Sequence, residues 1–275
     1  MNLRQWHIVC MTTATLGIAS LTFSADAADT APAALSAKEL ASGLFALQDG
    51  ASYVRLRLEV KQPIDTTKFA LQLQIKQRRT KTSTDLVYQV LWPKERKGEA
   101  VLLHKAEGSL PSGSLFVPPA KPRSLDASQM HEALFGSDLS YQDVIENFFG
   151  WDDQRIVGAE VLNRVPCVIL ESRPDNGEPS SYASVRSWID SRRLVPLRVE
   201  KYLPSGQLGR RIDTTRVATD DKGRSIPADL TVHGPREDSV TELDGSRIRH
   251  DVTYSDRDFT PEGLTDTLAP PAAAQ

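Results

Sequence analysis

The stretch from Val54 to Lys61 reads Val-Arg-Leu-Arg-Leu-Glu-Val-Lys, with an apolar residue at every second position. A second stretch, from Phe69 to Lys76, reads Phe-Ala-Leu-Gln-Leu-Gln-Ile-Lys and repeats this alternation. Because successive side chains of a strand point to opposite faces of its sheet, each segment has one apolar face and one wet face. The pattern is typical of an antiparallel sheet that is covered on one side and solvated on the other.

Segments of similar character recur through the rest of the chain. Further strands are predicted at residues 85–92, 99–105, 114–117, 155–163, 167–173, 182–190, 197–202, 208–218, 225–233 and 240–254. Turn sequences such as Pro204-Ser205-Gly206 separate them. This spacing favours a barrel or sandwich over βαβ units. We therefore expect an α+β protein, mainly antiparallel β, with about eleven strands curled toward a barrel and two or three short helices.

One helix is predicted near the start of the chain. Ser36 is followed three residues later by Glu39, which is the spacing of a capping box. Leu40 and Leu44 then fall on one helical face. The segment Ser36–Leu47 is therefore expected to be an amphipathic helix that needs an apolar surface to lie on.

The N-terminus has the pattern of an export signal. Arg4 precedes an apolar run from Ile8 to Phe23, and Ala25-Asp26-Ala27 resembles a signal-peptidase site. A transmembrane anchor is the alternative, but the run contains several Thr and Ser and is short of a span of about 20 residues. The expected organisation is a signal peptide at 1–27, a flexible lead-in at 28–35, a single domain at 36–259 and a disordered tail at 260–275.

Composition excludes some functions. The 275 residues are 40% hydrophobic and 25% charged, as in ordinary globular proteins, and the net charge of −3 provides no basic footprint for nucleic acid. Cys10 lies within the predicted signal, so Cys167 stays alone and no intramolecular disulfide is expected. Its Val-Pro-Cys-Val-Ile setting is typical of a buried strand thiol, which is normally unreactive.

Signals for catalysis and for metal binding are lacking in the sequence. No Gly-x-Ser-x-Gly elbow, P-loop or dinucleotide fingerprint occurs. No two histidines beyond the predicted signal have the i, i+4 spacing of a helical metal pair; they are His104, His131, His233 and His250. We therefore expect a protein that is not an enzyme and that carries no cofactor or metal.

The centre of the chain contains a different kind of segment. Phe135 to Asn147 reads Phe-Gly-Ser-Asp-Leu-Ser-Tyr-Gln-Asp-Val-Ile-Glu-Asn. Gly136 permits a positive φ, and Ser140 with Asp143 resembles a capping box, so a tight turn followed by a short helix is predicted. Asp138 and Asp143 are interpreted as caps of backbone N–H groups, with an acid–base pair as the alternative. Tyr141 is interpreted as a packing residue, with stacking on a ligand as the alternative.

The same segment resembles a known family. Residues 136–143, Gly-Ser-Asp-Leu-Ser-Tyr-Gln-Asp, resemble the signature of outer-membrane lipoprotein-sorting proteins, secreted relatives of the LolA/LolB carriers of Gram-negative bacteria. The matching motif residues are Gly136, Ser137, Asp138, Tyr141 and Asp143. With weaker fragments such as Trp188-Ile189-Asp190, the resemblance covers about Ser36 to Phe259. It implies an incomplete, half-open barrel whose concave apolar face is lidded by helices, here the Ser36–Leu47 helix and the central motif.

An incompletely covered sheet leaves an apolar groove, which suits acyl chains. The candidate lipid-binding residues are Leu56, Leu58, Leu71, Leu73 and Ile75, with Trp92 and Trp188 near the rim. The alternative is that these residues fill an ordinary dry core. The basic run Lys76–Lys81 is interpreted as a solvated hairpin tip, with contact to anionic headgroups as the alternative.

These observations leave three hypotheses. The first is a periplasmic carrier of lipid or lipoprotein acyl chains, for which the resemblance implies an inner-membrane RND-type exporter as partner. The second is an envelope sensory or structural interaction module of the same fold with a filled core. The third is a secreted hydrolase with dispersed carboxylates. Because no cargo-gating arginine can be aligned, the cargo stays open.

Overall fold

The computed structural model describes residues 35–62, 66–175, 179–235 and 238–266. The predicted signal peptide, most of the predicted lead-in and residues 267–275 of the predicted tail lie outside these ranges. Within the described ranges, no helix has the length and apolar character required to cross a membrane.

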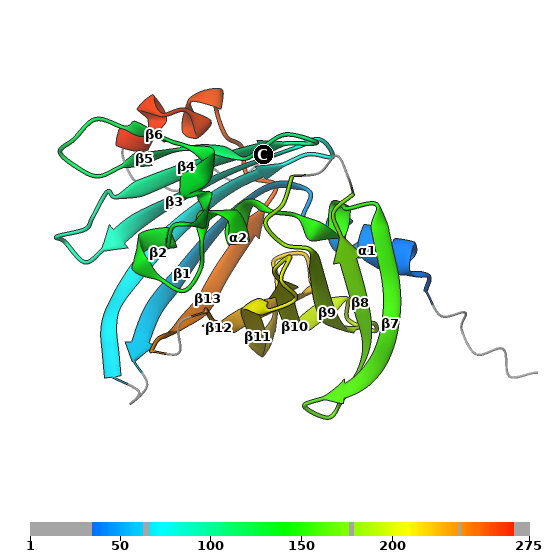
Figure 1. Ribbon diagram of the computed structural model, residues 1–275. Coiled ribbons are helices and arrows are strands. Elements are labelled where there is room, and N and C mark those ends of the chain that lie inside the picture. Colours follow the sequence, from blue (N-terminus) through cyan, green and yellow to red (C-terminus); the bar gives the residue numbers. More distant parts are fainter. Residues whose placement is uncertain (1–34, 63–65, 176–178, 236–237, 267–275) are drawn as a thin grey trace, which may run out of the picture. The chain divides into compact units, whose positions relative to one another are not determined.

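The described residues form one antiparallel sheet of thirteen strands, in the order β6-β5-β4-β3-β2-β1-β13-β12-β11-β10-β9-β8-β7 (Figure 1). The strands are β1 Gly50–Gln62, β2 Thr66–Arg79, β3 Ser83–Trp92, β4 Ala100–Ala106, β5 Ser112–Phe116, β6 Arg123–Leu125, β7 Asp153–Leu162, β8 Val165–Arg173, β9 Ser184–Asp190, β10 Val195–Tyr202, β11 Leu208–Thr219, β12 Ser225–His233 and β13 Val240–His250. The two edge strands, β6 and β7, do not pair with each other, so the sheet is open. The predicted half-open antiparallel barrel is confirmed, with thirteen strands instead of about eleven. The short β6 lies in a proline-rich stretch where no strand was predicted.

Short helices accompany the sheet. They are α1 Ala37–Ala46, α2 Tyr141–Ile145 and the 3-10 turns η1 Ala127–His131, η2 Leu134–Gly136, η3 Phe148–Gly150, η4 Asp256–Phe259 and η5 Glu262–Thr265. The capping box at α1 is present, because the Ser36 side chain accepts from the Glu39 N–H and the Glu39 carboxylate accepts from the Ser36 N–H.

The ordered chain continues past the predicted domain boundary at Phe259. In η5, Leu264 is 1% exposed and packs with Val87 and Leu102 on strands β3 and β4. The part of the predicted tail that the structure describes, residues 260–266, is therefore folded onto the sheet. The reason is a single leucine in a polar stretch, which gives this segment an apolar anchor.

One face of the sheet, here called the inner face, carries the main core. Directly opposed residues of neighbouring strands share a face, and the register runs Val60–Thr241–Val232–Ile212–Val199 across β1, β13, β12, β11 and β10. Figure 1 shows the sheet curving around α2 on this side.

The segment from residue 127 to residue 150, here called the central segment, covers the inner face of β1–β4. Leu134 and Leu139 belong to the same buried cluster as Leu58 and Leu73. Along the sheet, α1 covers β8 and β9 with Leu40 and Leu44, which pack against Leu170 and Ile189.

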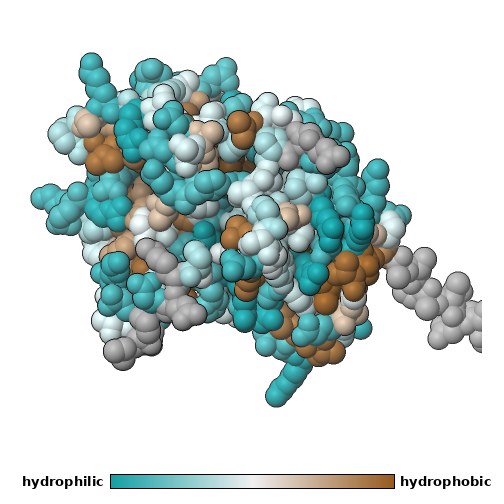
Figure 2. All heavy atoms as spheres, viewed as in Figure 1, coloured by the Kyte–Doolittle hydropathy of each residue, from teal (hydrophilic) through white to brown (hydrophobic). Residues whose placement is uncertain are grey.

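The edge strand β7 is largely exposed. Ile156, Val157 and Val161 are 45%, 46% and 66% exposed, respectively. Figure 2 shows hydrophobic side chains gathered over the β7–β8 hairpin.

Candidate functional site

Four of the predicted lining residues come together on the inner face. Leu58, Leu71 and Leu73 are each 1% exposed, and Leu56 packs against the same cluster. Their neighbours in this cluster include side chains of the central segment. At β1 and β2 the inner face is therefore filled by the protein's own side chains. Ile75 is also buried in β2.

The two predicted rim tryptophans do not join these residues. Trp92 ends β3 and is 53% exposed. Trp188 precedes the inner-face residue Ile189, so its ring points to the opposite face, where it packs with Cys167. The Trp188 Nε1–H donates to Glu160 Oε2 at 2.7 Å.

Asp143 of the central motif holds α2 on the sheet. Lys201 Nζ on β10 lies 3.0 Å from Asp143 Oδ1, and Arg210 Nε on β11 lies 2.9 Å from Oδ2. The Tyr182 hydroxyl donates to Oδ1 at 2.7 Å. Burial alone raises the pKa of Asp143, but Lys201 and Arg210 outweigh it and hold the pKa well below its usual range.

Asp143 also caps α2. Its carboxylate accepts from the N–H and hydroxyl of Ser140, and the Ser140 Oγ accepts from the Asp143 N–H. The capping interpretation of Asp143 is therefore confirmed by the contacts, and the two cations are an addition to it.

Asp138 fastens the other end of the motif. Its carboxylate accepts from the Ser239 hydroxyl at 2.7 Å and the Thr241 hydroxyl at 2.8 Å; Thr241 lies in β13, and Ser239 directly precedes this strand. Asp138 and Asp143 thus have separate partners and do not form a carboxylate pair. Gly136 has a φ of 86°, as predicted from the turn.

The other motif residues are packed within the fold. Ser137 is 1% exposed, and its Oγ accepts from the Leu139 N–H. Tyr141 is 5% exposed and belongs to the core cluster of the inner face, which agrees with the packing interpretation.

Sequence reasoning missed the basic partners of Asp143. Lys201 is 1% exposed and follows Val199 by two residues, so it occupies an inward-facing position of β10 where alternation calls for an apolar side chain. A lysine at such a position signals a buried anionic partner. The identity of that partner requires the tertiary structure.

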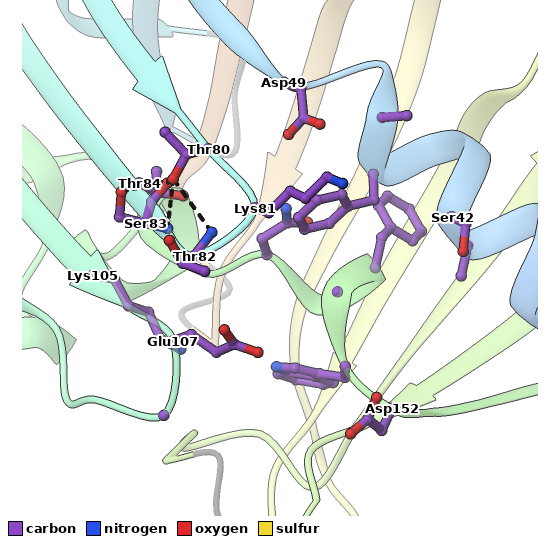
Figure 3. A pocket seen from close by; sticks show the side chains of 18 of the residues that line it. Ser42, Asp49, Thr80, Lys81, Thr82, Ser83, Thr84, Lys105, Glu107 and Asp152 are labelled. Atoms are coloured by element: carbon purple, nitrogen blue, oxygen red, sulfur yellow. Dashed lines mark hydrogen bonds between the residues drawn. The ribbon is translucent and has the colours of Figure 1, made fainter.

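A cleft of about 730 Å³ lies between α1, the β2–β3 turn, the β4–β5 turn and η3 (Figure 3). Its apolar wall includes Ala41 and Phe45 of α1, together with Phe149, and Asn147 and Trp151 also line the cleft. The Phe45 ring lies close to the backbone of Gly150. A glycine permits this approach, because a Cβ at position 150 would lie 2.8 Å from the ring.

The remaining wall of the cleft is polar. Figure 3 shows Lys105 and Glu107 on one side, beside the turn that carries Thr80–Thr84, while Asp152 and Ser42 lie across from them. Lys81, from the predicted hairpin tip, also borders the cleft. The cleft was not predicted, because its walls come from four segments that are distant in the sequence.

An open antiparallel sheet with short helices on its inner face defines the class of LolA-like open barrels. Three solved structures share this fold. A DUF1329 family protein from Desulfovibrio piger has a TM-score of 0.75 and 21% identity, covering 83% of this chain and 97% of that chain. A domain described as an outer membrane lipoprotein-sorting protein, from Vibrio parahaemolyticus, has a TM-score of 0.73 and 18% identity, covering 84% and 98%. A LolA superfamily protein from Nitrosomonas europaea has a TM-score of 0.65 and 18% identity, covering 82% and 98%.

The sequence itself matches a family model over residues 82–266, and the chain belongs to that family, whose description is "uncharacterized protein". No curated protein matches the chain in sequence. At these identities the solved structures establish the fold alone, and this is the half-open barrel that was expected.

Proposed function

We propose that this protein binds the acyl chain of a lipid or lipoprotein in the periplasm and acts as a carrier, not as an enzyme. The observation that supports this proposal is the cleft, which joins an apolar wall on α1 and η3 to a polar rim. Such a site matches an amphiphile, because the acyl chain lies against the apolar wall while the polar end meets the rim.

The size of the cleft is compatible with this ligand. Its volume of about 730 Å³ falls in the range of small-molecule sites, about 300–1,000 Å³. Each methylene that leaves water contributes about 0.8 kcal/mol, so ten methylenes contribute about 8 kcal/mol before the entropic cost of binding.

In the proposed mechanism, α1 is the moving lid. Its docking depends on the apolar side chains Leu40, Ala41 and Leu44, whose contacts an acyl chain replaces with contacts of the same kind. The central segment is held by the buried ion pairs of Asp143 and the hydroxyl contacts of Asp138. The motif is therefore an anchor in this mechanism. The central segment covers the leucines of β1 and β2, so they can line the ligand site only if this segment moves away.

An interaction module is the second candidate function, and the filled inner face at β1–β4 favours it. In that case the domain binds a protein partner on its surface. For the carrier, by contrast, we propose an inner-membrane RND-type exporter as the partner, on the ground of the family resemblance alone. A hydrolase is disfavoured, because both motif carboxylates already have cationic or hydroxyl partners.

The test is native mass spectrometry with lipid extraction, on protein purified from a periplasmic fraction without detergent. We expect a stoichiometric lipid adduct or, after delipidation, uptake of added phospholipid or acylated peptide. Ser42 is an exposed residue of α1 that lines the cleft. Ser42→Trp places a large ring in the cleft and should weaken binding by roughly tenfold or more. The matched control Arg57→Trp on β1, outside the cleft, should bind as the wild type does. A clean apo mass with no uptake contradicts the carrier proposal, and pull-down experiments then test the interaction module.

A further inference from the structure

Polar atoms without partners gather at one edge of the cleft. Among the described residues, five buried side-chain nitrogen or oxygen atoms lack a hydrogen-bond partner, and three of them belong to Glu146, Asn147 and Trp151. Asn147 and Trp151 both line the cleft. Unpaired buried polar atoms are unfavourable and uncommon, so the two that belong to residues lining the cleft, on Asn147 and Trp151, point to a ligand that supplies their hydrogen-bond partner.

The unpaired atoms of Asn147 and Trp151 are N–H donors. They are Asn147 Nδ2 and Trp151 Nε1, so the group that completes them must supply an oxygen acceptor. Lys105 lines the same cleft, and its Nζ lies 3.7 Å from Glu146 Oε1. The lining of the cleft thus holds both signs of charge, with Lys81 and Lys105 alongside Glu107 and Asp152, so the two donors require an oxygen acceptor without fixing its charge.

The indole of Trp151 is held in place from two sides. Gln154 Nε2 donates to the Trp151 carbonyl at 2.8 Å and to the Phe148 carbonyl at 3.0 Å, which fixes the backbone of η3. The ring is 6% exposed and packs against Tyr182 and Phe148. With its ring enclosed by these contacts, Trp151 keeps its donor in a fixed position, as expected of a preorganised binding group.

We propose that Trp151 and Asn147 bind the polar end of the amphiphile, and that this end carries a carboxylate, ester or phosphate oxygen. This inference rests on the proposed function, because it assigns the polar end of the ligand whose acyl chain lies along Phe45 and Phe149. The ligand oxygen reaches the buried donors when α1 shifts, which the carrier mechanism already requires.

The test compares Trp151→Phe with the matched variant Trp188→Phe. Each change keeps an aromatic ring and removes one indole N–H, but the Trp188 Nε1–H is already paired with Glu160. Isothermal titration calorimetry measures binding of palmitate, monopalmitoylglycerol and a lysophospholipid. Hexadecyltrimethylammonium, below its critical micelle concentration, serves as a matched chain without an oxygen acceptor. Urea unfolding of the ligand-free variants is measured in parallel.

We expect Trp151→Phe to bind at least one oxygen-bearing ligand roughly tenfold more weakly and to bind the acceptor-free chain unchanged. The ligand that loses most affinity identifies the carboxylate, ester or phosphate. Trp188→Phe should bind every ligand as the wild type does. Without ligand, Trp151→Phe should unfold at a higher urea concentration than Trp188→Phe, because only the latter breaks an existing hydrogen bond.

Two results overturn the inference and are distinguishable. If the wild type binds the oxygen-bearing ligands and Trp151→Phe binds them equally well, the polar-end assignment is wrong while the carrier proposal stands. If the wild type binds none of the four chains, both proposals are wrong.

Discussion

Burial and charge act against each other at Glu146. The side chain is almost completely buried, and burial raises the pKa of its carboxyl group even though Lys201 and Lys105 lower it. The nearest cationic atom recorded for it, Lys105 Nζ, is 3.7 Å from Oε1, which is beyond hydrogen-bond distance. The attraction of the lysines therefore offsets only part of the cost of burying a charged Glu146 carboxylate.

This residue makes stability depend on pH in a defined direction. Because the folded-state pKa is above the ordinary value of 4.5, the folded protein binds more protons than the unfolded chain between these two values. The free energy of unfolding should consequently fall as pH rises from 4.5 through the folded pKa. Glu146→Gln should remove this fall, as measured by urea unfolding over a pH series.

The pH range of this effect lies above the pH range in which carboxyl groups with a lowered pKa, such as Asp143, affect stability. Asp143 has a folded pKa below its ordinary value, so its stabilising contribution is present above the ordinary value and is lost as pH falls through the folded pKa. Glu107→Gln, at an exposed glutamate, is the matched control and should keep the wild-type profile. A fall that persists unchanged in Glu146→Gln would show that another group causes it.

At the scale of elements, α2 is joined to the sheet by charge. The helix has five residues, which is too short to be stable by itself. Asp143 connects it to β10 through Lys201 and to β11 through Arg210. The polar attachment of α2 to β10 and β11 therefore depends on one carboxylate.

Asp143→Asn should lower the free energy of unfolding by about 3–5 kcal/mol, because it leaves the buried ammonium of Lys201 without its anionic partner. Chemical denaturation measures this loss. Asp153→Asn, which breaks the exposed pair with Arg155, is the control and should lower it by less than about 1 kcal/mol. Equal effects of the two substitutions would contradict the anchoring role of Asp143.

At the scale of the molecule, the first strand of the sheet pairs with the last. Ser52 of β1 lies opposite His250 of β13, and this pairing stands in the middle of the strand order. Strands β2–β6 extend from one side of it and β12–β7 from the other. The two halves of the sheet are therefore joined through contacts between the first and the last of its strands.

A chain that ends at residue 234, before β13, should lose its cooperative folding, because β1 and β12 then have no common neighbour. Near-ultraviolet circular dichroism and urea unfolding measure this loss. A peptide of residues 238–266 added in trans provides the control, and it should restore part of the signal. A truncated chain that still unfolds in one cooperative transition would contradict this prediction.

Local features were predictable from the sequence, and long-range neighbours were not. Alternation in Val54–Lys61 indicates which side chains share a face, and β1 has that pattern. The spacing of Ser36 and Glu39 likewise predicts the start of α1. Both signals arise within a few residues of the chain, where backbone geometry alone decides the outcome.

The cleft and the strand order depend on contacts that no local pattern encodes. Alternation does not show that β1 lies beside β13, and nothing near Trp151 in the sequence indicates that Phe45 and Lys105 border the same cavity. Trp188 illustrates the same difficulty. The sequence does not show which face of the sheet its ring occupies, and the ring lies on the face opposite the inner face, where it packs with Cys167.

The exposed edge strand β7 bears on how the protein behaves when it is concentrated. A ten-residue strand with unpaired backbone groups and exposed Ile156 and Val161 is a template on which another molecule's strand adds, the first step of aggregation. The register of β7 with β8 shifts between Ile156 and Gly158, which leaves Val157 as an extra residue in the middle of the edge. A straight incoming strand cannot pair continuously across this bulge, so we expect the irregularity to hinder the addition of strands at this edge.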